Sequence, residues 1–165
     1  MVFLGIDPGT AITGYGLVRE SAGSLEAVAY GVITTPSDWE LPRRLVVLHR
    51  ELSSLLMLHR PVSAAVEQLF FSRNVRTAFA VGQARGVVLL ALAQAGVPIA
   101  EYSPLEVKQT VTGYGRADKK QIQEMIRVLL GLPDIPRPDD AADALAIAVC
   151  HLHSSQINRL VDTTR

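Results

Sequence analysis

The sequence predicts an α/β domain in which a five-stranded mixed sheet is flanked by helices. Hydrophobic residues make up 48% of the chain but aromatic residues only 5%, and this composition favours helices packed on a sheet over a sandwich of short aromatic-rich strands. Three strand-like runs precede the first helical pattern, and later strand-like and helical runs alternate. The length of 165 residues suits one domain that buries its own core.

The strands are marked by short apolar runs that end in turn residues. The first run is broken by Pro8-Gly9, so the next run should return antiparallel to it. A later run, at residues 64–66, ends in Glu67, and the helix expected before it allows a crossover that places this strand parallel to the first. We expect strands at residues 2–6, 13–18, 27–35, 64–66 and 98–102.

Apolar residues spaced three or four apart predict the helices. This spacing indicates helices at about 42–60 and 76–94, and typical helix starts follow at Ser103-Pro104 and Asp118. The last helix is expected to run from Asp139-Asp140 to about His153. The segment 112–118 contains two glycines and is expected to be a mobile loop.

Composition also limits the environments in which the chain can work. Cys150 is the only cysteine, so the chain can form no internal disulfide and no thiolate metal cluster. No basic leader precedes the first strand, and no apolar run reaches the roughly 18 residues of a membrane span. We therefore expect a cytoplasmic protein that does not act at a membrane. Residues 1–158 should form a single domain and residues 159–165 a flexible tail.

Charge is balanced over the whole chain but uneven along it. Sixteen basic and sixteen acidic residues give a net charge of zero, which argues against a protein that simply coats nucleic acid. Residues 68–130, however, hold eight basic and four acidic residues, an excess of about +4. A solvated face is one reading of this excess, and contact with a polyanion is the other. Candidate contacts to nucleic acid in this stretch include Arg73, Arg76 and Lys120.

Carboxylates are the residues most suited to chemistry. Asp7 ends the first strand and Glu67 ends the fourth, so parallel pairing of these strands would place both at one edge of the sheet. Asp140 and Asp143 are three apart in the first turn of the last helix and project on one side of it. Four such acids can hold two Mg²⁺ or Mn²⁺ ions that flank a phosphodiester. Without metal they repel one another, so the site should depend on cations.

Each acid also has a simpler explanation. Asp140 and Asp143 suit the start of any helix, because acidic residues there favourably meet the helix dipole. Asp7 before Pro8-Gly9 could be a turn residue. Glu67 is harder to explain this way, because it directly follows a buried strand. The histidines share no spacing with the acids and are expected to have surface or helix-packing roles: His49, His59, His151 and His153.

Five short segments of the sequence together match the motifs of a known family. They are Gly5-Ile6-Asp7-Pro8-Gly9 with Thr13-Gly14-Tyr15-Gly16, Val66-Glu67-Gln68 followed by Phe70, Gly82-Gln83-Ala84-Arg85-Gly86, Val107-Lys108-Gln109-Thr110-Val111, and Asp140-Ala141-Ala142-Asp143-Ala144-Leu145-Ala146. In this order, over nearly the whole chain, they resemble the RuvC family of bacterial Holliday junction resolvases.

The resemblance implies a ribonuclease H-like fold and a homodimer. The implied activity is an endonuclease that cuts a four-way DNA junction symmetrically by two-metal hydrolysis and leaves 5′-phosphate and 3′-hydroxyl ends. The implied setting is DNA recombination and repair in the bacterial cytoplasm, with a branch-migration motor of the RuvA-RuvB type as a partner.

The resemblance also assigns roles to single residues. Lys108 and Lys119 face DNA, with Lys119 acting at the reacting phosphate. Phe70 matches an aromatic residue that stacks at the junction, although core packing is the alternative for this side chain. The metal ligands implied are Asp7, Glu67, Asp140 and Asp143.

Three features depart from the family pattern or leave it open. Ala11 stands where some family members carry a basic residue, which puts one backbone contact in doubt. Asp139 is an additional carboxylate beside Asp140, and we interpret it as the helix cap while leaving open that it binds metal. The small residues at 82–86 permit close approach of another helix, either in a dimer or within the chain.

Other functions fit parts of the sequence. Residues 7–10 also resemble the first phosphate motif of actin-like ATPases and sugar kinases, but those folds need a second, similar domain for which 165 residues leave no room. A ribonuclease H-like nuclease acting on RNA is a nearer alternative. Another is a protein that bends a junction without cutting it, and the presence of all four acids argues against that reading.

Overall fold

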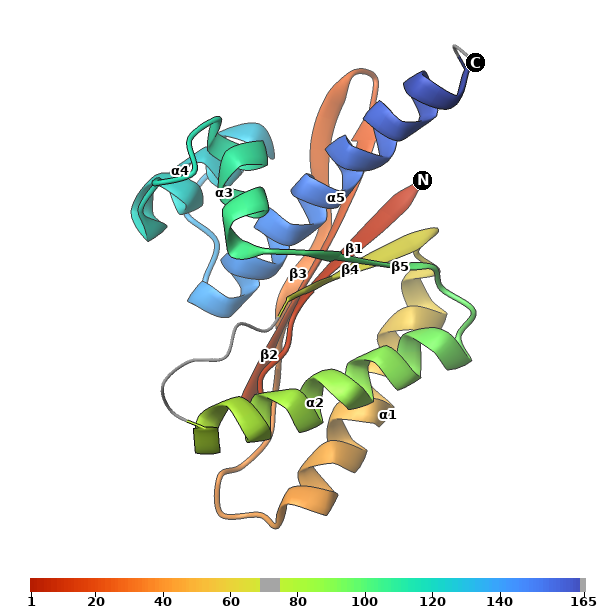
Figure 1. Ribbon diagram of the computed structural model, residues 1–165, viewed down its shortest axis with the longest axis vertical. Helices are drawn as coiled ribbons and strands as arrows, with labels where there is room; N and C mark the ends of the chain where they lie inside the picture. Colours follow the sequence, from red (N-terminus) through yellow and green to blue (C-terminus); the bar gives the residue numbers. More distant parts are fainter. Residues whose placement is uncertain (69–74, 164–165) are drawn as a thin grey trace.

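One mixed sheet forms the centre of the molecule. The structure is a computed structural model that describes the backbone of residues 1–68 and 75–163 and the side chains of residues 1–68 and 78–157. Five strands pair in the order β3-β2-β1-β4-β5 (Figure 1). Strands β1 to β3 are antiparallel neighbours, whereas β4 lies parallel to β1 and β5 parallel to β4, which confirms the predicted sheet. The strands are β1 (Val2–Asp7), β2 (Ile12–Ser21), β3 (Ser24–Thr34), β4 (Ser63–Glu67) and β5 (Ile99–Tyr102).

Helices cover both faces of this sheet. Helices α1 and α2 lie on one face, and α3, α4 and α5 lie on the other (Figure 1). Ser103 and Asp118 each form a capping box, so the predicted starts of α3 and α4 are confirmed. The helices are α1 (Leu41–His59), α2 (Val75–Gln94), α3 (Pro104–Thr112), α4 (Lys119–Leu129) and α5 (Asp139–Thr163). No helix in the described parts of the chain is both long and apolar enough to cross a membrane.

The end of the last helix differs from the prediction. Helix α5 continues to Thr163, whereas the fading apolar pattern predicted an end near His153. No glycine or proline stands between these two positions, so nothing interrupts the backbone hydrogen bonds after the apolar pattern of the sequence has faded. Residues 164–165 lie outside the described residues, and the flexibility of 159–165 remains a prediction.

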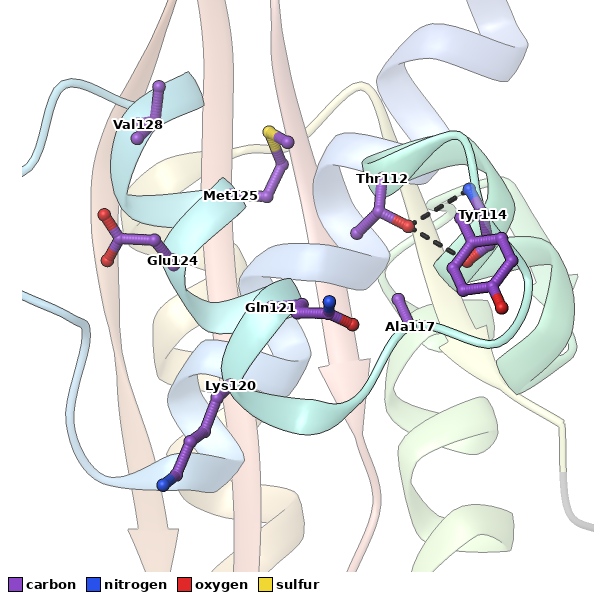
Figure 2. A pocket seen from close by; sticks show the side chains of 8 residues that line it. All are labelled: Thr112, Tyr114, Ala117, Lys120, Gln121, Glu124, Met125 and Val128. Atoms are coloured by element: carbon purple, nitrogen blue, oxygen red, sulfur yellow. Dashed lines mark hydrogen bonds between the residues drawn. The ribbon is translucent and has the colours of Figure 1, made fainter.

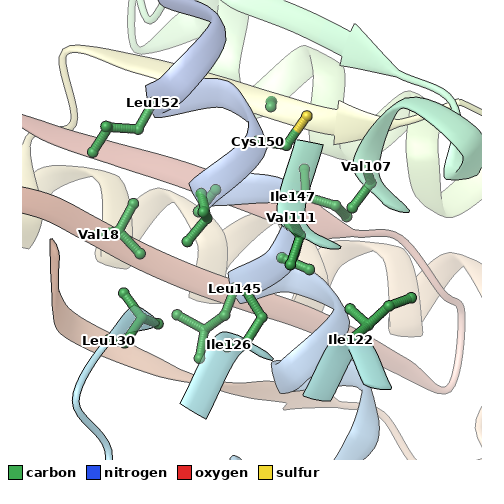
Figure 3. Packing of buried hydrophobic residues seen from close by; sticks show 14 of the residues in the cluster. Val18, Val107, Val111, Ile122, Ile126, Leu130, Leu145, Ile147, Cys150 and Leu152 are labelled. Atoms are coloured by element: carbon green, nitrogen blue, oxygen red, sulfur yellow. The ribbon is translucent and has the colours of Figure 1, made fainter. Parts of the chain in front are cut away.

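Strand alternation sends neighbouring residues of β1 into two different cores. Leu4 and Ile6 are fully buried against α1 and α2. Phe3 points the other way, into the core that β1 shares with α5. Because side chains alternate along a strand, Gly5 and Asp7 face α5 as well. That core is completed by residues from α3, α4 and α5 (Figure 3), including Val107, Val111, Ile122, Ile126, Leu145, Ile147 and Leu152.

Glycines let α5 lie directly on the sheet. A Cβ atom added to Gly14 would stand 2.0 Å from the backbone oxygen of Asp140, and one added to Gly5 would stand 2.2 Å from that of Ala144. A Cβ on Gly16 would likewise meet the backbone nitrogen of Leu145 at 2.7 Å. Any larger residue at these positions would therefore push the helix away. The first two turns of α5 are thus fixed above the end of β1.

A buried histidine near the middle of α5 connects this helix to β4 and β5. The side chain of His151 is only 4% exposed. Its Nε2 lies 2.7 Å from the Ser63 hydroxyl of β4, and its Nδ1 lies 3.0 Å from the Tyr102 hydroxyl of β5. Burial lowers the pKa of His151, which favours the neutral ring. Of the surface and helix-packing roles expected for the histidines, His151 has a packing role.

We expect Gly14→Ala to weaken the fold by about 1 to 3 kcal/mol, because the new methyl group collides with backbone rather than with a flexible side chain. Chemical denaturation in the presence of a chelator measures this loss. Gly31→Ala is the matched control, since it adds the same atom to β3 but meets only the Tyr15 ring and hydroxyl. Equal effects of the two substitutions would contradict the role assigned to Gly14.

Candidate active site

Asp7 and Glu67 meet at the edge where β1 and β4 end. Ile6 pairs with Val66 in the parallel ladder, and the same register places Asp7 beside Glu67 one residue later. Both side chains face α5, as alternation along their strands requires. The two carboxyl groups lie close enough to affect the pKa of one another.

The start of α5 brings Asp140 and Asp143 to the same edge. Asp7 pairs with Gly14 in the antiparallel ladder, and Gly14 is the residue on which the Asp140 backbone rests. Asp140 and Asp143 are close enough that both charges act on the Asp7 carboxyl. The structure therefore brings together all four acids that the sequence singled out.

Burial and mutual repulsion make these acids hard to ionise. Burial, followed by the charges of Glu67, Asp143 and Asp140, raises the pKa of Asp7 to about 8. Burial and the charge of Asp143 raise the pKa of Glu67. Burial also raises the pKa of Asp143, although a hydrogen bond from Lys119 opposes the shift. An added cation would relieve this repulsion.

Lys119 is the cation that the structure places among these acids. It begins α4, directly after the Asp118 cap, and its ammonium lies 3.1 Å from Asp143 Oδ2 and 3.3 Å from Asp139 Oδ2. Partial burial lowers the pKa of Lys119, but the hydrogen bonds and charges of Asp143 and Asp139 outweigh it and leave that pKa raised. The lysine therefore stays charged at the mouth of the acidic site.

Asp139 does not play the capping role predicted for it. It lies inside the first turn of α5, and the Pro138 carbonyl accepts the hydrogen bonds of the first helical N–H groups. The Asp139 carboxylate instead receives hydrogen bonds from Gln123 Nε2 at 3.1 Å and an Arg137 guanidinium nitrogen at 2.8 Å. Sequence reasoning missed both donors. The available signal was Gln123, a polar residue between Ile122 and Ile126 on the apolar face of a helix.

Two of the clefts in the described part of the chain lie beside α4, and one of them is lined by Glu67 and Asp143. A cleft of about 230 Å³ is lined by Glu67, Asp143, Lys119 and Lys108, with apolar walls from α3, α4 and α5. A larger, apolar cleft of about 530 Å³ runs between the end of α3 and the outer face of α4 (Figure 2). Lys120 lines this second cleft, so the adjacent lysines 119 and 120 belong to different surfaces. The smaller cleft is the candidate active site, because it holds the charged groups that chemistry needs.

Three of the predicted contacts to nucleic acid cannot be placed. Phe70 and Arg73 lie outside the described residues, and so does the side chain of Arg76. All three follow Glu67 closely in sequence, between β4 and the start of α2.

The donor set of the site fits a hard divalent cation. Four carboxylates offer only oxygen ligands, which Mg²⁺ and Mn²⁺ prefer. As these side chains stand, no three potential ligands in the described part of the chain are arranged to hold a metal ion. Lys119 contacts Asp143 Oδ2 and so occupies one oxygen that an ion would need. Movement of that lysine would free this oxygen.

A mixed five-stranded sheet with carboxylates at the ends of two parallel strands defines the class of ribonuclease H-like nucleases. The model of the family described as crossover junction endodeoxyribonuclease RuvC matches residues 3–151. The chain belongs to this RuvC family.

Relatives of known sequence or structure match this chain over almost its full length. RuvC of Syntrophomonas wolfei is 54% identical over 164 residues, which cover 99% of this chain and 95% of that protein. RuvC of Desulfitobacterium hafniense strain DSM 10664 / DCB-2 is 57% identical over 161 residues, covering 97% and 98%. The structure of Thermus thermophilus RuvC in complex with a Holliday junction substrate superposes with a TM-score of 0.91 at 38% identity and covers 96% of each chain. The resemblance and the fold inferred from the sequence are confirmed.

The raised pKa of Asp7 makes a prediction about stability. Asp7 keeps its proton in the folded chain up to about pH 8 but loses it near pH 4 when unfolded, so the metal-free fold should lose stability as the pH rises between these values. Asp7→Asn removes this effect and should stabilise the metal-free protein by about 2 kcal/mol at pH 8 but hardly at all at pH 4. Thermal unfolding with a chelator at a series of pH values measures the difference.

The control for this experiment is Asp38→Asn, which changes an exposed acid between β3 and α1. It should leave the stability difference near zero at every pH. A gain from Asp7→Asn that does not change with pH would contradict the electrostatic explanation.

Proposed function

We propose that this protein is a structure-specific endonuclease that resolves four-way DNA junctions by symmetric two-metal hydrolysis. The observation that carries the proposal is the meeting of Asp7, Glu67, Asp140 and Asp143 beside Lys119, at one edge of a ribonuclease H-like sheet. Membership of the RuvC family supports the choice of substrate, since the Thermus thermophilus relative has been solved with a Holliday junction. The products would carry 5′-phosphate and 3′-hydroxyl ends.

The four acids would hold two Mg²⁺ or Mn²⁺ ions in each active site. Bound there, the ions would supply an activated water and stabilise the leaving oxygen. The protein contributes a fixed arrangement of ligands, because β1, β4 and α5 are held together by the close glycine contacts and by the His151 hydrogen bonds. Such a framework keeps the carboxylates in position while the substrate arrives.

Lysines would bind and neutralise the reacting phosphate. Lys108 and Lys119 line the same cleft as Glu67 and Asp143, so a phosphate near these acids would lie within reach of both ammonium groups. Lysine suits this task because it is a compact charge that can follow a phosphate oxygen. We also propose contacts to more distant parts of the junction from Phe70, Arg73, Arg76 and Lys120.

A homodimer would supply the second active site that a symmetric cut requires. Helix α2 offers a surface for it, because Phe79 and Leu90 are 69% and 51% exposed and lie on one side of the helix. Gly86 lies between them, and a Cβ there would meet nothing within 4 Å in the chain. Ala84, by contrast, is buried against the sheet. The small residues of this helix thus serve both an internal contact and an open face.

This function would place the protein in DNA recombination and repair in the bacterial cytoplasm. A branch-migration motor of the RuvA-RuvB type is the proposed partner, because a junction must be moved to a position where it can be cut. Two alternative functions differ from this one, the first in the substrate that is cut and the second in whether the bound junction is cut at all. A nuclease acting on RNA would cut RNA duplexes, and a junction-bending protein would bind without cutting.

We expect the protein with Mg²⁺ or Mn²⁺ to cut a synthetic four-way junction into two nicked duplexes. Asp7→Asn should bind the junction but cut it at least about a thousandfold more slowly, because a metal ligand is lost. Gel assays with junction, linear duplex and RNA substrates measure both properties. Equal cutting of the linear duplex would contradict structural specificity, and cutting of RNA alone would favour the other nuclease class.

Lys119→Ala should slow cleavage by about 10- to 100-fold while weakening junction binding by less than about threefold, because its ammonium acts mainly on the reacting phosphate. Single-turnover cleavage and binding measured on the same junction separate the two effects. Lys120→Ala is the matched comparison, since it removes the same charge one residue away in a different cleft. As a proposed contact distant from the reacting phosphate, it should affect binding rather than the cleavage rate of the bound junction. A loss confined to affinity would rule out the proposed role of Lys119.

A further inference from the structure

Asp139 is held in one orientation by donors on two sides. Its Oδ1 accepts hydrogen bonds from Gln123 Nε2 and from Arg137. Its other oxygen, Oδ2, faces the Lys119 ammonium at 3.3 Å. The two oxygens therefore have different partners: Oδ1 accepts from Gln123 and Arg137, and Oδ2 lies toward the lysine.

The buried partner in this contact is Gln123. Its side chain is only 5% exposed, and it stands four residues after Lys119 on α4, so both project from the same side of the helix. A buried amide is costly to leave without partners, and its contact with Asp139 provides one. The contact also ties the start of α5 to α4, and so fixes Asp139 relative to the base of the lysine side chain.

Lys119 has a second acidic neighbour, Asp143, and the two neighbours differ in an important respect. Asp143 belongs to the group of four acids proposed to bind metal, whereas the oxygens of Asp139 are directed to Gln123, Arg137 and Lys119. A cation bound by Asp143 would repel the ammonium and take its hydrogen-bond acceptor. Asp139 would then remain as the contact that keeps Lys119 at the site.

We propose that Asp139, oriented by Gln123 and Arg137, is a positioning residue that holds the Lys119 ammonium beside the reacting phosphate when Asp143 is engaged by metal. A free lysine side chain has four rotatable bonds and considerable rotamer entropy, so one fixed acceptor narrows the region that its ammonium occupies. This inference rests on the proposed function of Lys119. It also excludes Asp139 as a metal ligand, a role that the sequence left open.

The test compares Asp139→Ala with wild type and with Lys119→Ala in single-turnover cleavage of a four-way junction at saturating Mn²⁺. Asp139→Ala should slow cleavage by roughly 5- to 20-fold, because Lys119 is less often in place. Junction binding should be unchanged or slightly tighter, since a negative charge has been removed. In the Lys119→Ala background, Asp139→Ala should have almost no further effect, because the two residues act as one unit.

Asp134→Ala is the matched control. It removes the same charge from an exposed position shortly before α5, and should leave the cleavage rate within about twofold of wild type. Thermal unfolding in a chelator checks that Asp139→Ala folds. The concentration of Mn²⁺ giving half-maximal cleavage should not change in Asp139→Ala.

Each contrary result has a distinct meaning. An increased requirement for Mn²⁺ in Asp139→Ala would make Asp139 a metal ligand and overturn the inference. An equal loss of rate from Asp139→Ala with and without Lys119 would also overturn it, because the two residues would then act independently. If Lys119→Ala itself cut at the wild-type rate, the proposed role of Lys119 would fail first, and if wild type cut no junction, the proposed function would fail.

Discussion

The direct contact between α5 and the sheet is the constraint on which the site depends. Gly5, Gly14 and Gly16 leave no side chain between the strands and the helix backbone. A helix on a sheet ordinarily keeps a layer of side chains between the two, and that separation would carry Asp140 and Asp143 away from Asp7. The glycines thus have a chemical consequence as well as a structural one. They allow acids from distant parts of the sequence to act on one another.

Strand alternation supplies the second half of the arrangement. Along β1, residues that face α1 and α2 are large and apolar, whereas those that face α5 are Phe3, Gly5 and Asp7. One face of the strand therefore contributes to core packing. The other face allows the close approach of α5 and then carries a carboxylate. Strand β4 repeats the pattern with Ala65 and Glu67. Parallel pairing of the two strands then places both acids at the same edge, where no further strand residue covers them.

Much of this arrangement could be predicted from the sequence, because its causes are local. Apolar runs, turn residues and capping residues identified the five strands and the starts of the helices, and parallel pairing followed from the intervening helix. The end of α5 was missed because a helix with no glycine or proline continues after its apolar stripe has ended. The role of Asp139 was missed because its partners lie on α4 and in the preceding loop. Contacts of this kind depend on how elements pack, which residue spacing alone does not encode.

The charges of the site indicate how its metal-free state would be related to the proposed metal-bound state. Two positive groups reduce the repulsion among the acids: the proton that Asp7 keeps at neutral pH, because its pKa is raised to about 8, and the ammonium of Lys119 on Asp143. Both stabilising groups are positive, and each occupies an oxygen that a metal would need. On the proposed function, metal held by these acids would release the proton of Asp7 and displace Lys119 from Asp143. The displaced ammonium would remain beside the acids through Asp139, at the place where a phosphate brings new negative charge. Repulsion among the carboxylates, which weakens the metal-free fold, would in this way favour both the binding of cations and the transfer of Lys119 to the substrate.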